Sequence, residues 1–127
     1  MLLKLLIMAG AMPVVAGAEP QDPAPRCTTR FEDILQGELR QRRSPLEVDD
    51  FVLKCRGDIR ASLRVRQGRT SWIHPELAVF DGQAWQPVDH GHHIVFRANP
   101  GRYRYRLIHD GPADSVPQWQ LQLSKPR

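Results

Sequence analysis

The chain has few of the residues on which small proteins most often build reactive sites. Cys27 and Cys55 are its only cysteines, so it has no Cys-x-x-Cys pair, and neither has a histidine nearby in the sequence. Its serines, at positions 44, 62, 71, 115 and 124, include no G-x-S-x-G nucleophile motif. A chain of 127 residues has room for one hydrophobic core and little space for a closed pocket. We therefore expect a single-domain protein that is not an enzyme.

Long hydrophobic runs are also missing after the first eighteen residues. The stretch MLLKLLIMAGAMPVVAGA contains one lysine and ends in Ala16-Gly17-Ala18, the small-x-small pattern that signal peptidase cleaves. A transmembrane helix needs about 20 apolar residues, and Pro13 interrupts this run. We predict a signal peptide over residues 1–18, no transmembrane segment, and a mature chain that begins at Glu19 and is periplasmic or secreted.

Export changes the meaning of the two cysteines, because an oxidising compartment lets an isolated pair close. We predict a disulfide between Cys27 and Cys55. Closing a loop of this size stabilises a fold by roughly 3 kcal/mol through chain entropy. A reactive thiol or a metal site is the alternative interpretation.

Short alternations of apolar and polar residues recur from Thr28 onwards, separated by Gly, Pro, Asp and Asn, which is typical of an all-β domain. We expect a Pro-rich lead-in over residues 19–27 and a β-sandwich domain over 28–127. Asp81-Gly82 predicts a two-residue hairpin turn. Three strands have clear inward sets: Ile59, Ala61, Leu63 and Val65; Tyr103, Tyr105 and Leu107; Trp119, Leu121 and Leu123.

The segment TTRFEDILQGELRQRR, residues 28–43, is ambiguous. Thr29 and Glu32 have the spacing of a helical capping box, which would place an apolar stripe at Phe31, Ile34 and Leu35. The same residues can form two strands around Gly37. The local pattern alone slightly favours the helix.

The order of several marks along the chain resembles the bacterial pre-peptidase C-terminal (PPC) domain family and its collagen-binding relatives. The marks are Gly37, Asp49 with Phe51, Asp81-Gly82, and Gly101 with Tyr103. The resemblance spans about residues 31–124 and implies a small antiparallel, jelly-roll-like β-sandwich, with a strand pair over Phe31 to Arg42. It also implies a non-catalytic module that binds protein, collagen or carbohydrate, in some members with calcium. The acidic residues that would correspond to a calcium site are Glu47, Asp49 and Asp50. Side chains that accept amide hydrogen bonds in a turn are the alternative there.

Two arginine rows occupy the outward positions of two expected strands: Arg60, Arg64 and Arg66, and Arg102, Arg104 and Arg106. If both strands face the same side, the rows would merge into one basic face for an anionic partner: an acidic protein surface, a glycan or a lipopolysaccharide phosphate. The alternative is a solvated face that prevents edge pairing. Trp72 and Trp85 are candidates to stack against a sugar or protein. Export, and the lack of outward aromatics between the arginines, argue against nucleic acid.

A histidine cluster in VDHGHH carries the second functional hypothesis. His90, His92 and His93 adjoin Asp89, and imidazole with carboxylate suits Zn(II) or Cu(II). A solvated turn at Gly91 is the alternative. We therefore expect an exported binding or accessory module without a cofactor, the alternative being a periplasmic metal-binding protein. The sequence does not set the oligomeric state.

Overall fold

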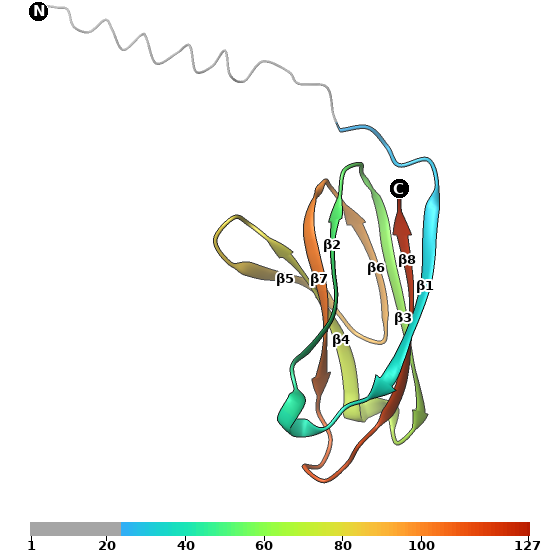
Figure 1. Ribbon diagram of the computed structural model, residues 1–127, viewed down its shortest axis with the longest axis vertical. Helices are drawn as coiled ribbons and strands as arrows, with labels where there is room; N and C mark the ends of the chain where they lie inside the picture. The colour runs from blue at the N-terminus through green and yellow to red at the C-terminus, as the bar shows by residue number, and fades with distance from the viewer. Residues whose placement is uncertain (1–23) are drawn as a thin grey trace, which may run out of the picture.

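The computed structural model describes residues 24–127 and folds them into two antiparallel four-stranded sheets packed face to face (Figure 1). Sheet 1 has the order β1 (Arg30–Glu38), β8 (Gln118–Pro126), β3 (Gly57–Gln67) and β6 (His93–Ala98). Sheet 2 has the order β2 (Leu46–Leu53), β7 (Gly101–His109), β4 (Ile73–Phe80) and β5 (Trp85–His90). Short 3-10 turns lie at Gln41–Arg43 and Thr70–Trp72.

This strand order is that of a jelly roll, in which eight antiparallel strands form two sheets. The expected all-β, jelly-roll-like sandwich is confirmed. The predicted signal peptide over residues 1–18, and the lead-in as far as residue 23, lie outside the described residues. Within residues 24–127, no helix has the length and hydrophobicity needed to cross a membrane.

The core forms where the inner faces of the two sheets meet. The expected inward residues on β3, β7 and β8 are buried, and only Val65, near the end of β3, is half-buried. Alternation predicts these faces well because successive side chains of a strand point to opposite sides. Each fully buried leucine or isoleucine stabilises the fold by about 1.5–3 kcal/mol, so the paired inner faces hold the sandwich together.

Residues 30–38 form one strand, so the expected helix and the expected strand pair are both wrong. All nine residues of β1 pair with β8, from Arg30 opposite Pro126 to Glu38 opposite Gln118. This pairing outweighs the local helical pattern, since tertiary context overrides weak propensity. Gly37 lies within the strand and not in a turn. A Cβ at Gly37 would lie 3.1 Å from Cζ2 of Trp119, whose indole packs over the backbone there.

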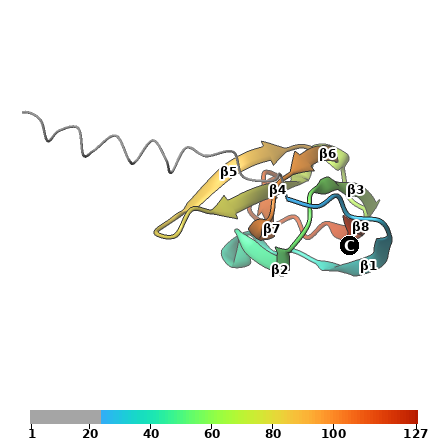
Figure 2. The ribbon, with the colours of Figure 1, turned by 90° about the horizontal axis from the view of Figure 1, so that it is seen from above.

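The hairpin of β4 and β5 extends beyond the rest of the sandwich (Figures 1 and 2). Its loop has four residues, Asp81 to Ala84, where the sequence predicted a two-residue turn. The Asp81 carboxylate accepts hydrogen bonds from the amides of Ala84 and Gln83, at 2.9 and 2.8 Å, and these bonds lower the pKa of Asp81. The predicted hairpin is therefore present, with a loop closed by the aspartate side chain as well as by the backbone.

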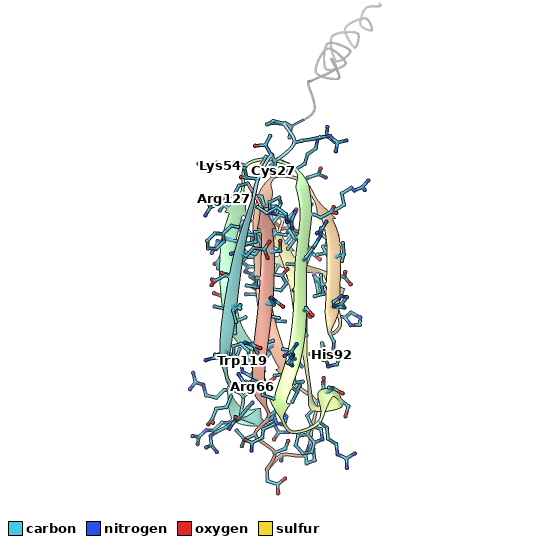
Figure 3. All side chains as sticks on the ribbon, turned by 90° about the vertical axis from the view of Figure 1, so that its right-hand side faces the viewer. Cys27, Lys54, Arg66, His92, Trp119 and Arg127 are labelled. Carbon is cyan, nitrogen blue, oxygen red and sulfur yellow. A yellow bond between two sulfur atoms is a disulfide. The ribbon has the colours of Figure 1, made fainter. Side chains whose placement is uncertain are left out.

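The predicted disulfide is present, with the Sγ atoms of Cys27 and Cys55 2.01 Å apart and their Cα atoms 5.0 Å apart. Next to it, the Cys27 amide donates to the carbonyl oxygen of Arg56 at 2.9 Å. The bridge therefore fastens the segment before β1 to the turn between β2 and β3, at the end of the sandwich labelled by Cys27 in Figure 3.

Candidate anion-binding face

The two arginine rows lie on opposite outer surfaces of the sandwich. β3 belongs to sheet 1 and β7 to sheet 2, and on both strands the residues that alternate with the arginines point into the shared core. The rows therefore point away from each other, and the single basic stripe expected from the sequence does not form. We call them the β3 row (Arg60, Arg64 and Arg66) and the β7 row (Arg102, Arg104 and Arg106).

Carboxylates from both neighbouring strands neutralise the β7 row. Arg102 donates from Nε and Nη2 to the two carboxylate oxygens of Asp50 on β2, at 3.0 and 2.6 Å. The hydrogen bond from Arg102 lowers the pKa of Asp50, and the same bond raises the pKa of Arg102. Arg106 donates from Nε and Nη2 to Oε1 of Glu76 on β4, at 3.1 and 2.8 Å. Both guanidinium groups are thus committed within sheet 2.

The middle arginine of this row packs on an aromatic ring. The guanidinium carbon of Arg104 lies 4.4 Å from the ring centroid of Trp85, and that of Arg102 lies 5.2 Å away. Arg104 also lies 3.7 Å from a carboxylate oxygen of Glu47, and only 18% of its side chain is exposed. Trp85, a candidate to stack against a partner, is therefore covered by the protein's own arginines. The β7 row has the contacts of a stabilising network.

The β3 row has a different environment. Arg64 and Arg66 are exposed, and among residues 24–127 neither forms an ion pair. Arg60 reaches a carboxylate oxygen of Asp58 only at 3.6 Å, and 53% of its side chain is exposed. Figure 3 views the molecule from the side of sheet 1, with Arg66 labelled toward the lower end. Arg64 and Arg66 are therefore the two arginines of this row whose charge no ion pair compensates among residues 24–127.

Neutral amides line the strand beside the β3 row. On β8, three glutamines alternate with the buried residues Trp119, Leu121 and Leu123, so they share the outer surface with the arginines. These glutamines are Gln118, Gln120 and Gln122. An amide side chain offers hydrogen-bond donors and an acceptor but no charge. We call this outer surface, made of the β3 row and the three glutamines, the β3 face.

Each arginine of the β3 row lines a separate shallow hollow in the β3 face. Arg66 lines a hollow of about 410 Å³ with Glu38 and Gln118. Arg64 lines one of about 360 Å³ with Ile34 and Gln120, and Arg60 one of about 260 Å³ with His93 and Val95. Ile34 and Val95 are 53% and 60% exposed and add apolar contact area to the Arg64 and Arg60 hollows. Glu38 and Glu32 also place a carboxylate in the walls of the Arg66 and Arg60 hollows.

The structure separates the three histidines predicted to share a metal. His90 ends β5 on the outer surface of sheet 2, and its ring lies 5.9 Å from that of His74. His92 places Nε2 2.5 Å from the carbonyl oxygen of Thr70, while His93 lies on the outer surface of sheet 1. Within the described part of the chain, no three His, Cys, Asp or Glu side chains are grouped so as to hold a metal ion.

The acidic residues considered for calcium lie on β2 and not in a turn. Asp50 contacts Arg102, and Glu47 contacts Arg104. Asp49 instead contacts Lys125 of β8, whose Nζ lies 2.7 Å from its carboxylate, so this pair links the two sheets. The three carboxylates therefore face three different cations of the protein.

Trp72, the other candidate for stacking, is used in packing. Its ring covers two glycines: a Cβ at Gly111 would lie 2.6 Å from Cγ of Trp72, and one at Gly68 3.0 Å from Cε3. Sequence reasoning missed the glutamine row of the β3 face, although the strict alternation of WQLQL carried the signal.

Comparison with protein-family models, with curated proteins and with solved structures found no match for this chain. The resemblance to the PPC domain family therefore stays a prediction that rests on the sequence marks alone. One of those marks, Gly37, lies in a paired strand and not in a turn.

Proposed function

We propose that this chain is an exported, non-catalytic binding module that docks an acidic glycan through the β3 face. The observation that carries the proposal is the contrast between the two rows. Every arginine of the β7 row has a carboxylate within 3.7 Å. In the β3 row Arg60 has one, Asp58 at 3.6 Å, whereas Arg64 and Arg66 have none among the described residues.

The chemistry of the β3 face fits a sulfated or carboxylated sugar chain. Guanidinium groups form forked, charge-assisted hydrogen bonds with such anions, each contributing about 1.5–3 kcal/mol when fully engaged. The glutamine amides can donate to and accept from sugar hydroxyls. The exposed Ile34 and Val95 offer apolar contact to the faces of sugar rings. The proposed role involves no catalysis, since neither arginine nor glutamine is a general acid or base at neutral pH.

The test compares two variants that remove the same charge from different places. One replaces the β3 row with Arg60→Gln, Arg64→Gln and Arg66→Gln. The matched control is Arg42→Gln, Arg43→Gln and Lys54→Gln, three exposed cations in the 3-10 turn before β2 and directly after β2. Calorimetry measures binding of a heparin fragment as the model acidic glycan, with maltooctaose as the neutral one.

We expect the β3-row variant to lose about a hundredfold or more in affinity for the heparin fragment, and the control to change little. Equal loss in both variants would show that net charge alone drives binding and would overturn the proposal. Tighter binding of a poly-glutamate peptide than of the heparin fragment would overturn the glycan as the partner class and favour an acidic protein surface.

A further inference from the structure

Four arginines surround a hollow at the end of the sandwich that carries the disulfide. The hollow has a volume of about 300 Å³, and Cys27 lies in its wall. Its arginines come from four parts of the chain: Arg26 before β1, Arg30 at the start of β1, Arg56 in the turn before β3, and Arg97 in β6. Asp58 is the only carboxylate among its lining residues, so the wall carries an excess of three positive charges.

Two of these arginines are fixed by hydrogen bonds and still have free donors. Arg30 donates from Nε to Oγ of Ser124 and from Nη2 to the carbonyl oxygen of Asp58, both at 2.7 Å. Arg56 donates from Nε to the carbonyl oxygen of Ala24 at 2.9 Å. Among the described residues, Nη1 of Arg30 and both Nη atoms of Arg56 donate to no protein atom. Because the two side chains are already held in place, these N–H groups can donate to an anion without the side chains having to become ordered on binding.

The other two arginines are exposed and weakly held. Arg97 has 92% of its side chain exposed and approaches the Asp58 carboxylate only at 3.9 Å. Arg26 is exposed and has no side-chain hydrogen bond or ion pair within residues 24–127. Both can therefore turn toward an anion at the hollow without breaking a strong contact.

The backbone around the hollow is held rigidly. The disulfide and two amide hydrogen bonds, Cys27 to Arg56 and Arg56 to the carbonyl oxygen of Pro25, join the two chain segments that carry Arg26 and Arg56. A Cβ at Gly57 would lie 2.7 Å from Cβ of Pro126, so the C-terminal strand is packed directly against this turn. Preorganisation of this kind lowers the entropy cost of binding.

We propose that this hollow binds a phosphomonoester group. A carboxylate is matched by one guanidinium fork, whereas a phosphomonoester carries about two negative charges and three acceptor oxygens, which suits several converging arginines. The hollow is also large enough to take part of the molecule that carries the phosphate. None of Arg60, Arg64 and Arg66 lines it, so the inference goes beyond the β3 face and stands without it.

The test titrates the oxidised protein with inorganic phosphate while amide shifts are recorded by NMR, with acetate at equal ionic strength as the comparison anion. We expect saturable shifts at Gly57 and its neighbours with phosphate and much weaker effects with acetate. The double variant Arg26→Gln with Arg97→Gln should weaken phosphate binding about tenfold or more, and the control Arg42→Gln with Arg43→Gln should not. Absence of saturable shifts, or equal loss in the control, would overturn the proposal.

A further variant predicts an effect of opposite sign, which misfolding cannot imitate. Asp58→Asn removes the only carboxylate of the wall, so phosphate should bind several-fold more tightly. Weaker binding by this variant, once it is shown to be folded, would contradict the proposal.

Glucose 1-phosphate and vesicles of phosphatidylcholine with phosphatidic acid distinguish a sugar phosphate from a lipid phosphate as the source of the group. Binding of either supports the site, and binding of neither overturns it. The double variant Arg64→Gln with Arg66→Gln leaves Arg60 beside Asp58 and should keep its affinity for phosphate, so failure of this site and failure of the β3 face give different results.

Discussion

Tyr105 gives a sharp test of the core, because its ring and its hydroxyl contribute in opposite directions. The residue is fully buried in the middle of β7, and its ring stacks on Phe51 with centroids 6.0 Å apart. Its hydroxyl is buried and has no hydrogen-bond partner among the described residues. A buried polar group without a partner costs about 1–3 kcal/mol. The ring should therefore stabilise the fold while the hydroxyl destabilises it.

Two substitutions separate these contributions. Tyr105→Phe removes only the hydroxyl, and we expect the free energy of unfolding to rise by roughly 1 kcal/mol. Tyr105→Ala removes the ring as well and should lower the free energy of unfolding by about 3–5 kcal/mol. The matched control is Tyr103→Phe, since the Tyr103 hydroxyl donates to the carbonyl oxygen of Asn99 at 2.7 Å. Loss of that bond should lower the free energy of unfolding by about 1 kcal/mol.

The pH dependence of stability adds a second readout. Burial, with smaller effects from the charges of Asp49 and Asp89, raises the pKa of Tyr105 above its value in the unfolded chain, about 10. As pH rises above about 10, the unfolded state loses this proton while the folded state keeps it, so stability falls. Tyr105→Phe should lose less stability than the wild type over this range, because it lacks this ionisation.

Urea unfolding followed by fluorescence, at pH 8 and above pH 10, measures both effects. Destabilisation by Tyr105→Phe of more than about 1 kcal/mol would show that the Tyr105 hydroxyl has a hydrogen-bond partner and stabilises the fold, contrary to the prediction. If Tyr105→Phe lost as much stability as the wild type above pH 10, the predicted role of the Tyr105 ionisation would also be wrong.

Three further perturbations have defined outcomes. Reducing the disulfide should lower the melting temperature, with a loss of roughly 3 kcal/mol by calorimetry, because the closed loop no longer restricts the unfolded chain. Gly57→Ala should lower the urea midpoint by more than Gly101→Ala: a Cβ at Gly57 would lie 2.7 Å from Cβ of Pro126, whereas a Cβ at Gly101 would approach its nearest neighbour, Cε1 of Tyr103, only to 3.7 Å, and neither glycine has a positive φ. Arg102 lowers the pKa of Asp50, so the wild type loses the stabilising effect of this carboxylate when Asp50 is protonated at low pH. As pH falls below about 4, acid unfolding should therefore show a smaller loss of stability for Asp50→Asn than for the wild type.

The faces of the strands were predictable from the sequence, but the sheet to which each strand belongs was not. Alternation along DIRASLRV and RYRYRL shows which side chains point inward, because the period of a strand is two residues. It contains no information on whether two strands share a sheet. The jelly-roll order places β3 and β7 in different sheets, and this separates the two arginine rows.

The carboxylates that neutralise the β7 row follow from strand register, which is also a long-range property. On β2, Asp50 lies opposite Arg104 of β7 and bonds to Arg102, the next arginine of that row. On β4, Glu76 lies directly opposite its partner Arg106 of β7. Part of the hollow beside the disulfide could be predicted from the sequence. Arg26 and Arg56 each adjoin a cysteine, so the predicted disulfide already implied that these two arginines lie near each other.

β1 shows where local reasoning fails. Its sequence has a helical capping pattern, but the strand completes sheet 1 beside β8 and covers Trp119 with Gly37. The decisive contact is with a residue far along the chain, which no local window contains. Of its apolar residues, Leu35 packs against the core while Ile34 points to solvent, as a strand requires and a helix does not.

In the proposed function the arginines of β3, of which Arg64 and Arg66 have no ion pair among the described residues, form the docking surface, and the paired arginines of β7 do not. The most direct measurement is an NMR titration of the oxidised protein with the heparin fragment, with each shifted amide and arginine Nε–H assigned. We expect the largest shifts on β3 and β8, at Arg64, Arg66, Gln120 and Gln122. Largest shifts on β7 and β2, at Arg102 and Asp50, would contradict the proposed function.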